Sequence, residues 1–183
     1  MNINEIPLDK EVYLFEIDDV LIDRTDYILQ VYYLFGSFYE FTEGTSNAND
    51  IAQFMKKVRQ YHGEDKVFAA TKEMYGIDEK YKENFERLQA NAHIPLRINL
   101  MPEVEQLLVD LDKQNKKVAI LTKGNPVEQL NKLRFMDWGS AESSKNKLKV
   151  YFEDELVFKA LDPITFIAED LGVQADEMIY INR

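Results

Sequence analysis

The chain has 183 residues, of which 45% are hydrophobic and 12% aromatic, so it can form one ordinary domain or a core domain with a modest insert. Its formal net charge of −11 argues against nucleic acid or an anionic membrane as the main partner. The lack of cysteine excludes disulfides, thiol catalysis and cysteine-based zinc sites.

The N-terminus lacks the basic and apolar stretches of an export signal, and no apolar run is long enough to span a bilayer. We therefore expect a cytoplasmic protein. Because the chain is acidic overall, it has no general attraction for phosphorylated molecules, so a phosphate-binding site would need positive charge placed locally.

The first predicted element is a buried strand over residues 12–17, an apolar run that ends in Glu16, Asp18 and Asp19. Side chains two positions apart on a strand point the same way, so we expect Glu16 and Asp18 to project together from the carboxyl end, where open α/β sheets bind ligands. Two carboxylates this close repel each other unless a cation or a shared proton lies between them. The segment therefore indicates a metal site or an acid/base pair, or else a strand that runs out into a solvated acidic turn.

Residues 23–99 have helical periodicity and little strand signal. Four apolar stripes predict four helices in a small bundle inserted after the first strand. The stripes are Ile28, Val31, Tyr32, Phe35 and Phe38; Ile51, Phe54, Met55 and Val58; Val67, Phe68, Thr71 and Met74; and Tyr81, Phe85 and Leu88. Because Tyr32, Tyr33 and Tyr39 cannot all face inward, we expect some of them to line a cleft under the cap.

Residues 100–183 alternate between helices and strands, which is typical of a parallel sheet. Strands are predicted near residues 117–122, 149–152 and 177–181. Three helices should begin at prolines, because the first N–H of a helix has no partner within it. These prolines and the apolar faces that follow are Pro102 with Val104, Leu107, Leu108 and Leu111; Pro126 with Val127, Leu130 and Leu133; and Pro163 with Ile164, Ile167 and Leu171.

Local signals mark the ends of these helices. Asn125 and Asp162 precede two of the prolines as good N-caps, and Gly172 should end the third helix. Together the elements predict an α/β fold with a Rossmann-like doubly wound parallel sheet as its core. The core would comprise residues 1–22 and 100–183, and residues 23–99 would form an inserted helical cap.

A second segment that could carry chemistry follows the strand at residues 117–122. Thr122, Lys123 and Gly124 lead into a helix capped by Asn125. A helix N-terminus after a strand is a ready anion site, since it offers free backbone N–H groups, and Thr122 and Lys123 would add a hydroxyl and a positive charge. The alternative is an ordinary strand–loop–helix connection, which is common.

Several segments, in this order, resemble motifs of the haloacid dehalogenase-like superfamily of phosphatases and related hydrolases, in its branch with a helical cap after the first strand. The resemblance covers nearly the whole chain. Residues 15–21 (FEIDDVL) resemble the family's F-D-x-D-[DG]-[TV]-L. The further segments are ILTKG at 120–124 with Gln129 and Lys132-Leu133, DPITF at 162–166 against D-P-x-x-F, and LGV at 171–173 with EMIYI at 177–181.

The resemblance implies a Mg²⁺-dependent phosphohydrolase that forms an acyl-phosphate on the first acid of the first motif. That position is Glu16, and the acid/base two residues later is Asp18. Thr122 would hold the transferring group, with Lys123 and Gly124 beside it, and Lys159 is the nearest match to the lysine of the third motif. Glu16 and Asp18 would also be the Mg²⁺ ligands.

Three departures from the family pattern bear on catalysis. Glutamate at position 16 replaces aspartate and displaces the carboxylate by roughly 1 Å, an error that can cost about 100-fold in rate. Lys159 lies one residue too early and is followed by Ala160 instead of proline. Asn182 and Arg183 stand where the fourth motif would begin, so its metal-binding acids are absent from the sequence.

Two functions therefore remain open from the sequence. The first is a Mg²⁺-dependent phosphohydrolase of a small phosphorylated molecule, weak or inactive because of these departures. The second is a non-catalytic, regulatory relative that keeps the fold to bind a ligand or a protein partner.

Overall fold

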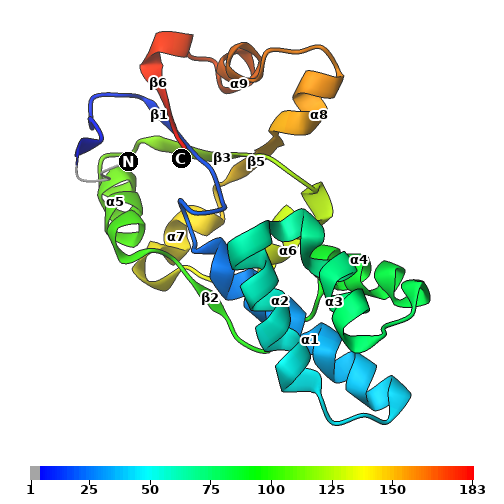
Figure 1. Ribbon diagram of the computed structural model, residues 1–183. Helices are drawn as coiled ribbons and strands as arrows, with labels where there is room; N and C mark the ends of the chain where they lie inside the picture. The colour runs from blue at the N-terminus through cyan, green and yellow to red at the C-terminus, as the bar shows by residue number, and fades with distance from the viewer. Residues whose placement is uncertain (1–4) are drawn as a thin grey trace. The chain divides into compact units, whose positions relative to one another are not determined.

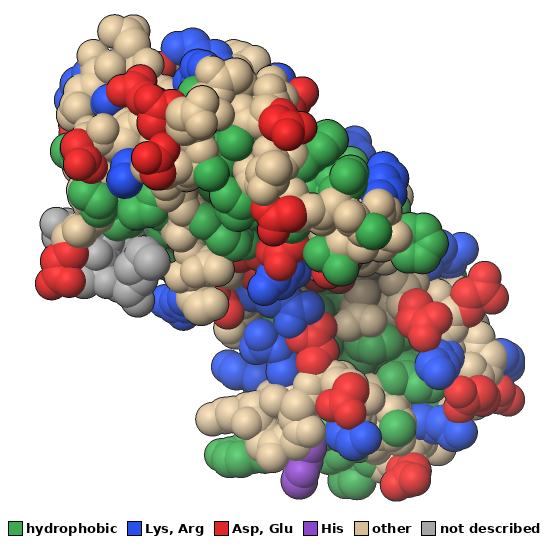
Figure 2. Space-filling view, turned by 90° about the horizontal axis from the view of Figure 1, so that it is seen from above, with side chains coloured by type: hydrophobic (Ala, Val, Ile, Leu, Met, Phe, Trp, Pro, Cys, Tyr) green, Lys and Arg blue, Asp and Glu red, His purple; other side chains and the backbone are tan. Residues whose placement is uncertain are grey.

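The computed structural model describes residues 5–183, and the chain divides into two compact units (Figure 1). One unit comprises the chain up to Arg24 together with Arg97–Arg183, and the other is Thr25–Leu96. No helix within residues 5–183 is long and apolar enough to cross a bilayer. On the face drawn in Figure 2, acidic and basic side chains are interspersed among hydrophobic ones.

The first unit contains a parallel sheet of four strands, which confirms the predicted α/β fold. In spatial order they are β5 (Lys149–Phe152), β3 (Lys117–Thr122), β1 (Val12–Phe15) and β6 (Met178–Ile181). Leu14 in β1 lies opposite Ala119 of β3 and Tyr180 of β6. Two of the predicted strands have the predicted bounds, while β1 ends two residues early because the chain turns after Phe15. A second pair, β2 (Ile98–Asn99) with β4 (Met136–Asp137), was not predicted.

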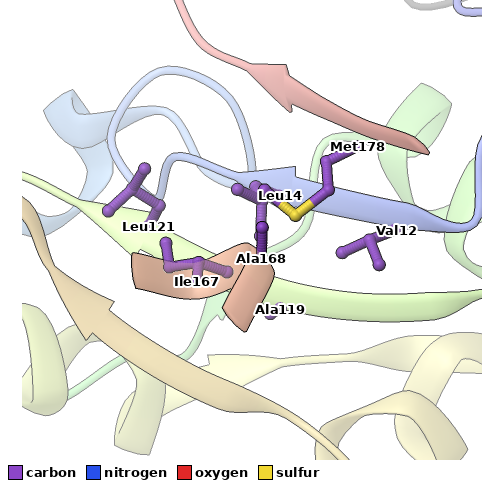
Figure 3. Close-up of a cluster of buried hydrophobic side chains, with 7 residues drawn as sticks. All are labelled: Val12, Leu14, Ala119, Leu121, Ile167, Ala168 and Met178. Atoms are coloured by element: carbon purple, nitrogen blue, oxygen red, sulfur yellow. The ribbon is translucent and has the colours of Figure 1, made fainter. Parts of the chain in front are cut away.

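One face of the four-stranded sheet packs against α9 (Pro163–Leu171). Figure 3 shows side chains from β1, β3 and β6 meeting two residues of this helix. The cluster consists of Val12, Leu14, Ala119, Leu121, Ile167, Ala168 and Met178, each at most 8% exposed. Since full burial of one aliphatic side chain contributes about 1.5–3 kcal/mol, this cluster fixes the strands firmly. Their carboxyl ends can then hold side chains in defined positions.

The helices of the first unit start where the sequence predicts. α5 (Pro102–Lys113), α6 (Pro126–Phe135) and α9 each have proline at the first position. Asn125 Oδ1 accepts a hydrogen bond from the Val127 amide at 2.9 Å, and Asp162 Oδ1 accepts one from the Thr165 amide at 2.8 Å, so both N-caps are confirmed. Gly172 ends α9 with a φ of 68°. The remaining helical segments are η4 (Gly139–Ala141), α7 (Glu142–Lys145), α8 (Glu153–Phe158) and η5 (Ala175–Glu177).

The predicted apolar face of α6 is wrong. Val127 and Leu130 are 52% and 50% exposed, whereas Gln129 and Lys132 are buried. Buried polar groups need hydrogen-bond partners, and these two side chains find theirs at Asp18. The helix is therefore oriented by polar contacts and not by its aliphatic residues.

The second unit contains four helices, as predicted, and an aromatic core. The Phe35 ring lies 5.2 Å from that of Phe85 and 6.1 Å from that of Phe68. Tyr33 is 53% exposed while Tyr32 and Tyr39 are buried, which confirms that they do not all face inward. The helical segments are α1 (Arg24–Glu43), α2 (Ala48–His62), η2 (Glu64–Lys66), α3 (Val67–Tyr75), η3 (Glu79–Tyr81) and α4 (Lys82–Asn91). Met74, expected in the third stripe, is instead exposed.

Candidate functional site

The site begins in the tight turn that follows β1. Asp19 has a φ of 60°, a left-handed conformation that aspartate tolerates better than most residues. The amide of Leu21 reaches back to the carbonyl of Glu16 at 3.3 Å, and Asp19 Oδ1 accepts from the Arg24 amide at 3.1 Å. Because the strand ends at Phe15, Glu16 and Asp18 lie in a turn and not on a strand. We expected the two side chains to project together, but each carboxylate has its own set of hydrogen-bond partners.

The carboxylate of Glu16 is bound by donors from β3, β6 and its own turn. Glu16 is 9% exposed, and its Oε1 accepts from the Thr122 hydroxyl and from the Ile17 amide at 2.8 Å. Its Oε2 accepts from the Lys123 amide at 3.2 Å and from the Tyr180 hydroxyl at 3.3 Å. We call the Thr122 hydroxyl and the Lys123 amide the donor pair. Both members of the donor pair are thus occupied by the side chain of Glu16.

Asp18 instead faces α6 and Arg24. Lys132 Nζ lies 2.8 Å from both carboxylate oxygens of Asp18, and the Lys132 side chain has no exposed surface. Gln129 Nε2 donates to Asp18 Oδ2 at 3.1 Å, and Arg24 Nε lies 3.2 Å from the same oxygen. Lys132 also pairs with Glu128 at 2.7 Å. Asp18 is therefore held as one member of a network of two acids and two bases.

Lys132 and Gln129 were not assigned a role from the sequence. Lys159, the residue matched to the lysine of the third motif, does not line the cavities that contain Glu16 or Asp18. The reason is local: β5 is followed by α8, and Lys159 is the residue that ends this helix. The signal that could have identified Lys132 is its spacing, because Glu128 and Lys132 are one helical turn apart on the face that also carries Gln129.

The anion site expected at the start of α6 has its donors taken by acceptors of the chain itself. The Gly124 amide donates to Asp154 Oδ2 at 2.7 Å, and Asn125 caps the helix. The ammonium of Lys123, whose side chain is 60% exposed, lies 3.6 Å from Glu153. Within residues 5–183, the Lys123 ammonium has three donors and only this one carboxylate beside it, so it is the group best placed to meet a ligand.

Two neighbouring cavities adjoin these residues within the first unit. One, of about 250 Å³, is lined by both acids together with Asp19, Lys123, Tyr180, Asn182 and Arg183. The other, of about 290 Å³, is lined by Asp18, Arg24, Lys123, Gly124, Asn125, Glu128 and Gln129. Lys123 and Asp18 line both, so the ends of β1 and β3 meet at one site. Gln129 Oε1 is buried there without a hydrogen-bond partner in the described part of the chain.

Tyr180 is a further site residue that the sequence did not suggest. Burial, followed by the negative charges of Glu16 and Glu153 and its hydrogen bonds to them, raises the pKa of Tyr180 above its usual value of 10.0. Its hydroxyl is thus protonated at neutral pH and able to donate to Glu16. The only sequence signal was a hydroxyl near the end of a core strand.

We expect Tyr180→Phe to reduce the loss of stability at alkaline pH. Above pH 10.0 the unfolded chain releases the tyrosine proton while the folded chain keeps it, so the free energy of unfolding falls as the pH rises toward the folded pKa. Urea unfolding at neutral pH and above pH 10.0 measures the difference. Tyr33→Phe, at a 53% exposed position, is the control, and an equal pH dependence of both variants would contradict the prediction.

The residues present do not fit the Mg²⁺ ion that the resemblance implies. Within residues 5–183, no three His, Cys, Asp or Glu side chains converge as a set that could hold a metal ion. Mg²⁺ needs oxygen ligands, but both oxygens of Glu16 accept from protein donors and both oxygens of Asp18 face Lys132. Arg183 lines the cavity of about 250 Å³ together with Glu16 and Asp18, and its positive charge opposes the binding of a cation there.

Comparison with known families and sequences gives one match. The family model described as "Haloacid dehalogenase-like hydrolase" matches residues 13–182. Among curated protein sequences, none matches this chain. The family match spans the turn after β1, the donor pair and the Asp18 network, so every residue of the candidate functional site except Arg183 lies within it.

Solved structures resemble the chain in fold. A protein from Thermotoga maritima assigned as a β-phosphoglucomutase is 19% identical, with 93% of this chain and 74% of that chain covered and a TM-score of 0.53. A HAD family hydrolase from Deinococcus radiodurans R1, with bound phosphate and sodium, is 16% identical, with 95% and 72% covered and a TM-score of 0.51. An L-2-haloacid dehalogenase from Xanthobacter autotrophicus is 18% identical, with 93% and 69% covered and a TM-score of 0.50.

Proposed function

The chain belongs to the haloacid dehalogenase-like hydrolases, and we propose that it binds a small phosphorylated molecule without hydrolysing it. The observation that carries the proposal is the hydrogen bonding of Glu16 to the donor pair. In an acyl-phosphate mechanism the donor pair would stabilise the charge on the transferring phosphoryl group. Here the carboxylate that should attack phosphorus already occupies those donors.

The length of the glutamate side chain explains this arrangement. Its additional methylene group lets the carboxylate reach the Thr122 hydroxyl, which an aspartate at the same position would approach less closely. A nucleophile must also lie within about 3–3.5 Å of the reacting atom in the right orientation, and errors near 1 Å are costly. The same methylene group therefore displaces the nucleophilic carboxylate and lets it occupy both donors of the donor pair.

A ligand would instead meet the cavity of about 290 Å³ next to the donor pair. Its lining includes two basic side chains, Lys123 and Arg24, and two acids, Asp18 and Glu128. Arg24 pairs with both acids, so an anionic group would bind through Lys123, whose ammonium has three donors and, among the described residues, a single carboxylate, Glu153, beside it. Gln129 Oε1, buried there without a partner among the described residues, can accept a hydrogen bond from a ligand hydroxyl. These groups suit a small phosphorylated molecule that also carries hydroxyl groups.

A second candidate function is slow phosphohydrolysis. It is favoured by the contact of Asp18 with Lys132, which places a buried lysine beside the predicted acid/base. If Glu16 turned away from the donor pair, these residues would still be in place. We rank this function second because the donor pair is occupied.

Hydrolysis of p-nitrophenyl phosphate and acetyl phosphate, each with and without Mg²⁺, distinguishes the two functions. We expect no turnover by the native protein above the rate in buffer. In Glu16→Asp, which withdraws the carboxylate from Thr122, turnover should be higher than in the native protein. Hydrolysis by the native protein that disappears in Asp18→Asn would overturn the binding proposal and support the slow enzyme.

A further inference from the structure

A cavity of about 300 Å³ lies at the opposite end of the sheet from Glu16 and the donor pair. Its lining includes Lys117 and Lys149, the first residues of β3 and β5, whereas Thr122 is the last residue of β3. A strand rises about 3.3 Å per residue, so Lys117 and Thr122 are roughly 16 Å apart along the strand. The cavity is thus separate from the candidate functional site. We call it the lysine cavity.

Four lysines line the lysine cavity, in a chain whose net charge is −11. Lys116 pairs with Glu11 at 3.1 Å, Lys147 with Asp112 at 2.7 Å and Lys149 with Asp170 at 2.9 Å. Lys117 Nζ donates to the neutral carbonyl of Leu171 at 3.0 Å. The four ammonium groups therefore face three carboxylates, and each ammonium has three donors, so donors remain for a ligand.

Ser144 provides a second and independent indication of a ligand. It lines the lysine cavity and is only 4% exposed, yet its hydroxyl has no hydrogen-bond partner within residues 5–183. A buried hydroxyl without a partner costs free energy, and such groups are uncommon in folded proteins. An acceptor oxygen of a bound molecule would satisfy it.

We propose that the lysine cavity binds a small molecule that carries a phosphate or pyrophosphate group. Ammonium groups and a hydroxyl are donors suited to phosphate oxygens. Val118 and Leu171 also line the cavity and give it an apolar part, against which the rest of such a ligand would pack. The volume is within the lower range of small-molecule sites. This site would act independently of the function proposed for the Glu16 end.

Calorimetric titration of the protein with sodium pyrophosphate tests the proposal, in EDTA and at constant ionic strength. We expect saturable binding to the native protein. Lys147→Gln/Lys149→Gln should weaken it roughly tenfold or more, because two charge-assisted contacts are lost. Lys66→Gln/Lys82→Gln removes two ion-paired, exposed lysines elsewhere and should bind as the native protein does.

Two further variants keep the test independent of folding and of the other site. Ser144→Ala removes the unpaired hydroxyl, so it should weaken binding several-fold without lowering the melting temperature. Lys123→Gln removes a cation of the candidate functional site, so pyrophosphate binding that persists in this variant belongs to the lysine cavity. The proposal is overturned if the native protein does not bind, if both lysine pairs behave alike, or if only Lys123→Gln loses binding.

Discussion

Glu16→Ala should lower the melting temperature of the protein by roughly 4–24 °C, and inorganic phosphate should raise it again. Removal of the carboxylate leaves the Thr122 hydroxyl and the Lys123 amide without an acceptor, and each buried unsatisfied group costs about 1–3 kcal/mol. In a protein of this size 1 kcal/mol corresponds to about 2–4 °C. Phosphate that binds the freed donor pair then stabilises the folded state by mass action.

Thermal unfolding with increasing phosphate, against chloride at equal ionic strength, measures both effects. Glu153→Ala is the matched control, because it removes a carboxylate that also contacts Lys123 and Tyr180 but leaves Glu16 on the donor pair. Phosphate should raise the melting temperatures of the native protein and of this control by less than it raises that of Glu16→Ala. An equal gain in all three proteins would mean that Glu16 does not block the donor pair.

Lys132→Met should be the most destabilising single change in the Asp18 network, with a loss of about 2–3 kcal/mol in the free energy of unfolding. The ammonium of Lys132 is fully buried and pairs with Asp18 and Glu128, so its loss leaves two largely buried carboxylates facing each other. This expected loss of stability lies at or below the lower end of what breaking a buried ion pair costs, because the side chains of Asp18 and Glu128 remain 20% and 15% exposed. Urea denaturation measures it.

A double variant separates lost pairing from lost packing. Asp18→Asn in the Lys132→Met background removes one of the two carboxylates that have lost the lysine, which leaves Arg24 to pair with Glu128, and should recover part of the loss. Lys113→Met, at a 67% exposed lysine paired with Asp110, should change stability little. If Lys132→Met were as stable as Lys113→Met, the network would not hold Asp18 as described.

The elements of the fold could be predicted because their signals are local. Pro126 and Asn125 mark the start of α6 whatever the rest of the chain does, since proline suits the first helical position and asparagine caps it. The orientation of the same helix could not be predicted, because Val127 and Leu130 give the expected apolar stripe but are exposed. Contacts with Asp18, more than 100 residues earlier, determine which side is buried.

The candidate site was predictable in position but not in its pairings. Parallel strands place their carboxyl ends at one edge, so Glu16 and Thr122 could be expected there. The hydrogen bond between Glu16 and the Thr122 hydroxyl depends on the extra length that one methylene group gives to the side chain. The spacing of residues in the sequence does not predict such a contact. Lys132, and not Lys159, lies beside Asp18. The sequence could not show this, because any helix that packs at this edge of the sheet can supply a lysine there.

Glu16 itself occupies the Thr122 hydroxyl and the Lys123 amide, the donors that a phosphoryl group would need. A crystal structure of the protein grown with inorganic phosphate tests this most directly. We expect the Glu16 carboxylate to accept hydrogen bonds from the Thr122 hydroxyl and the Lys123 amide, with no phosphate on either donor. Phosphate bound to both donors, with the Glu16 side chain turned away, would contradict it.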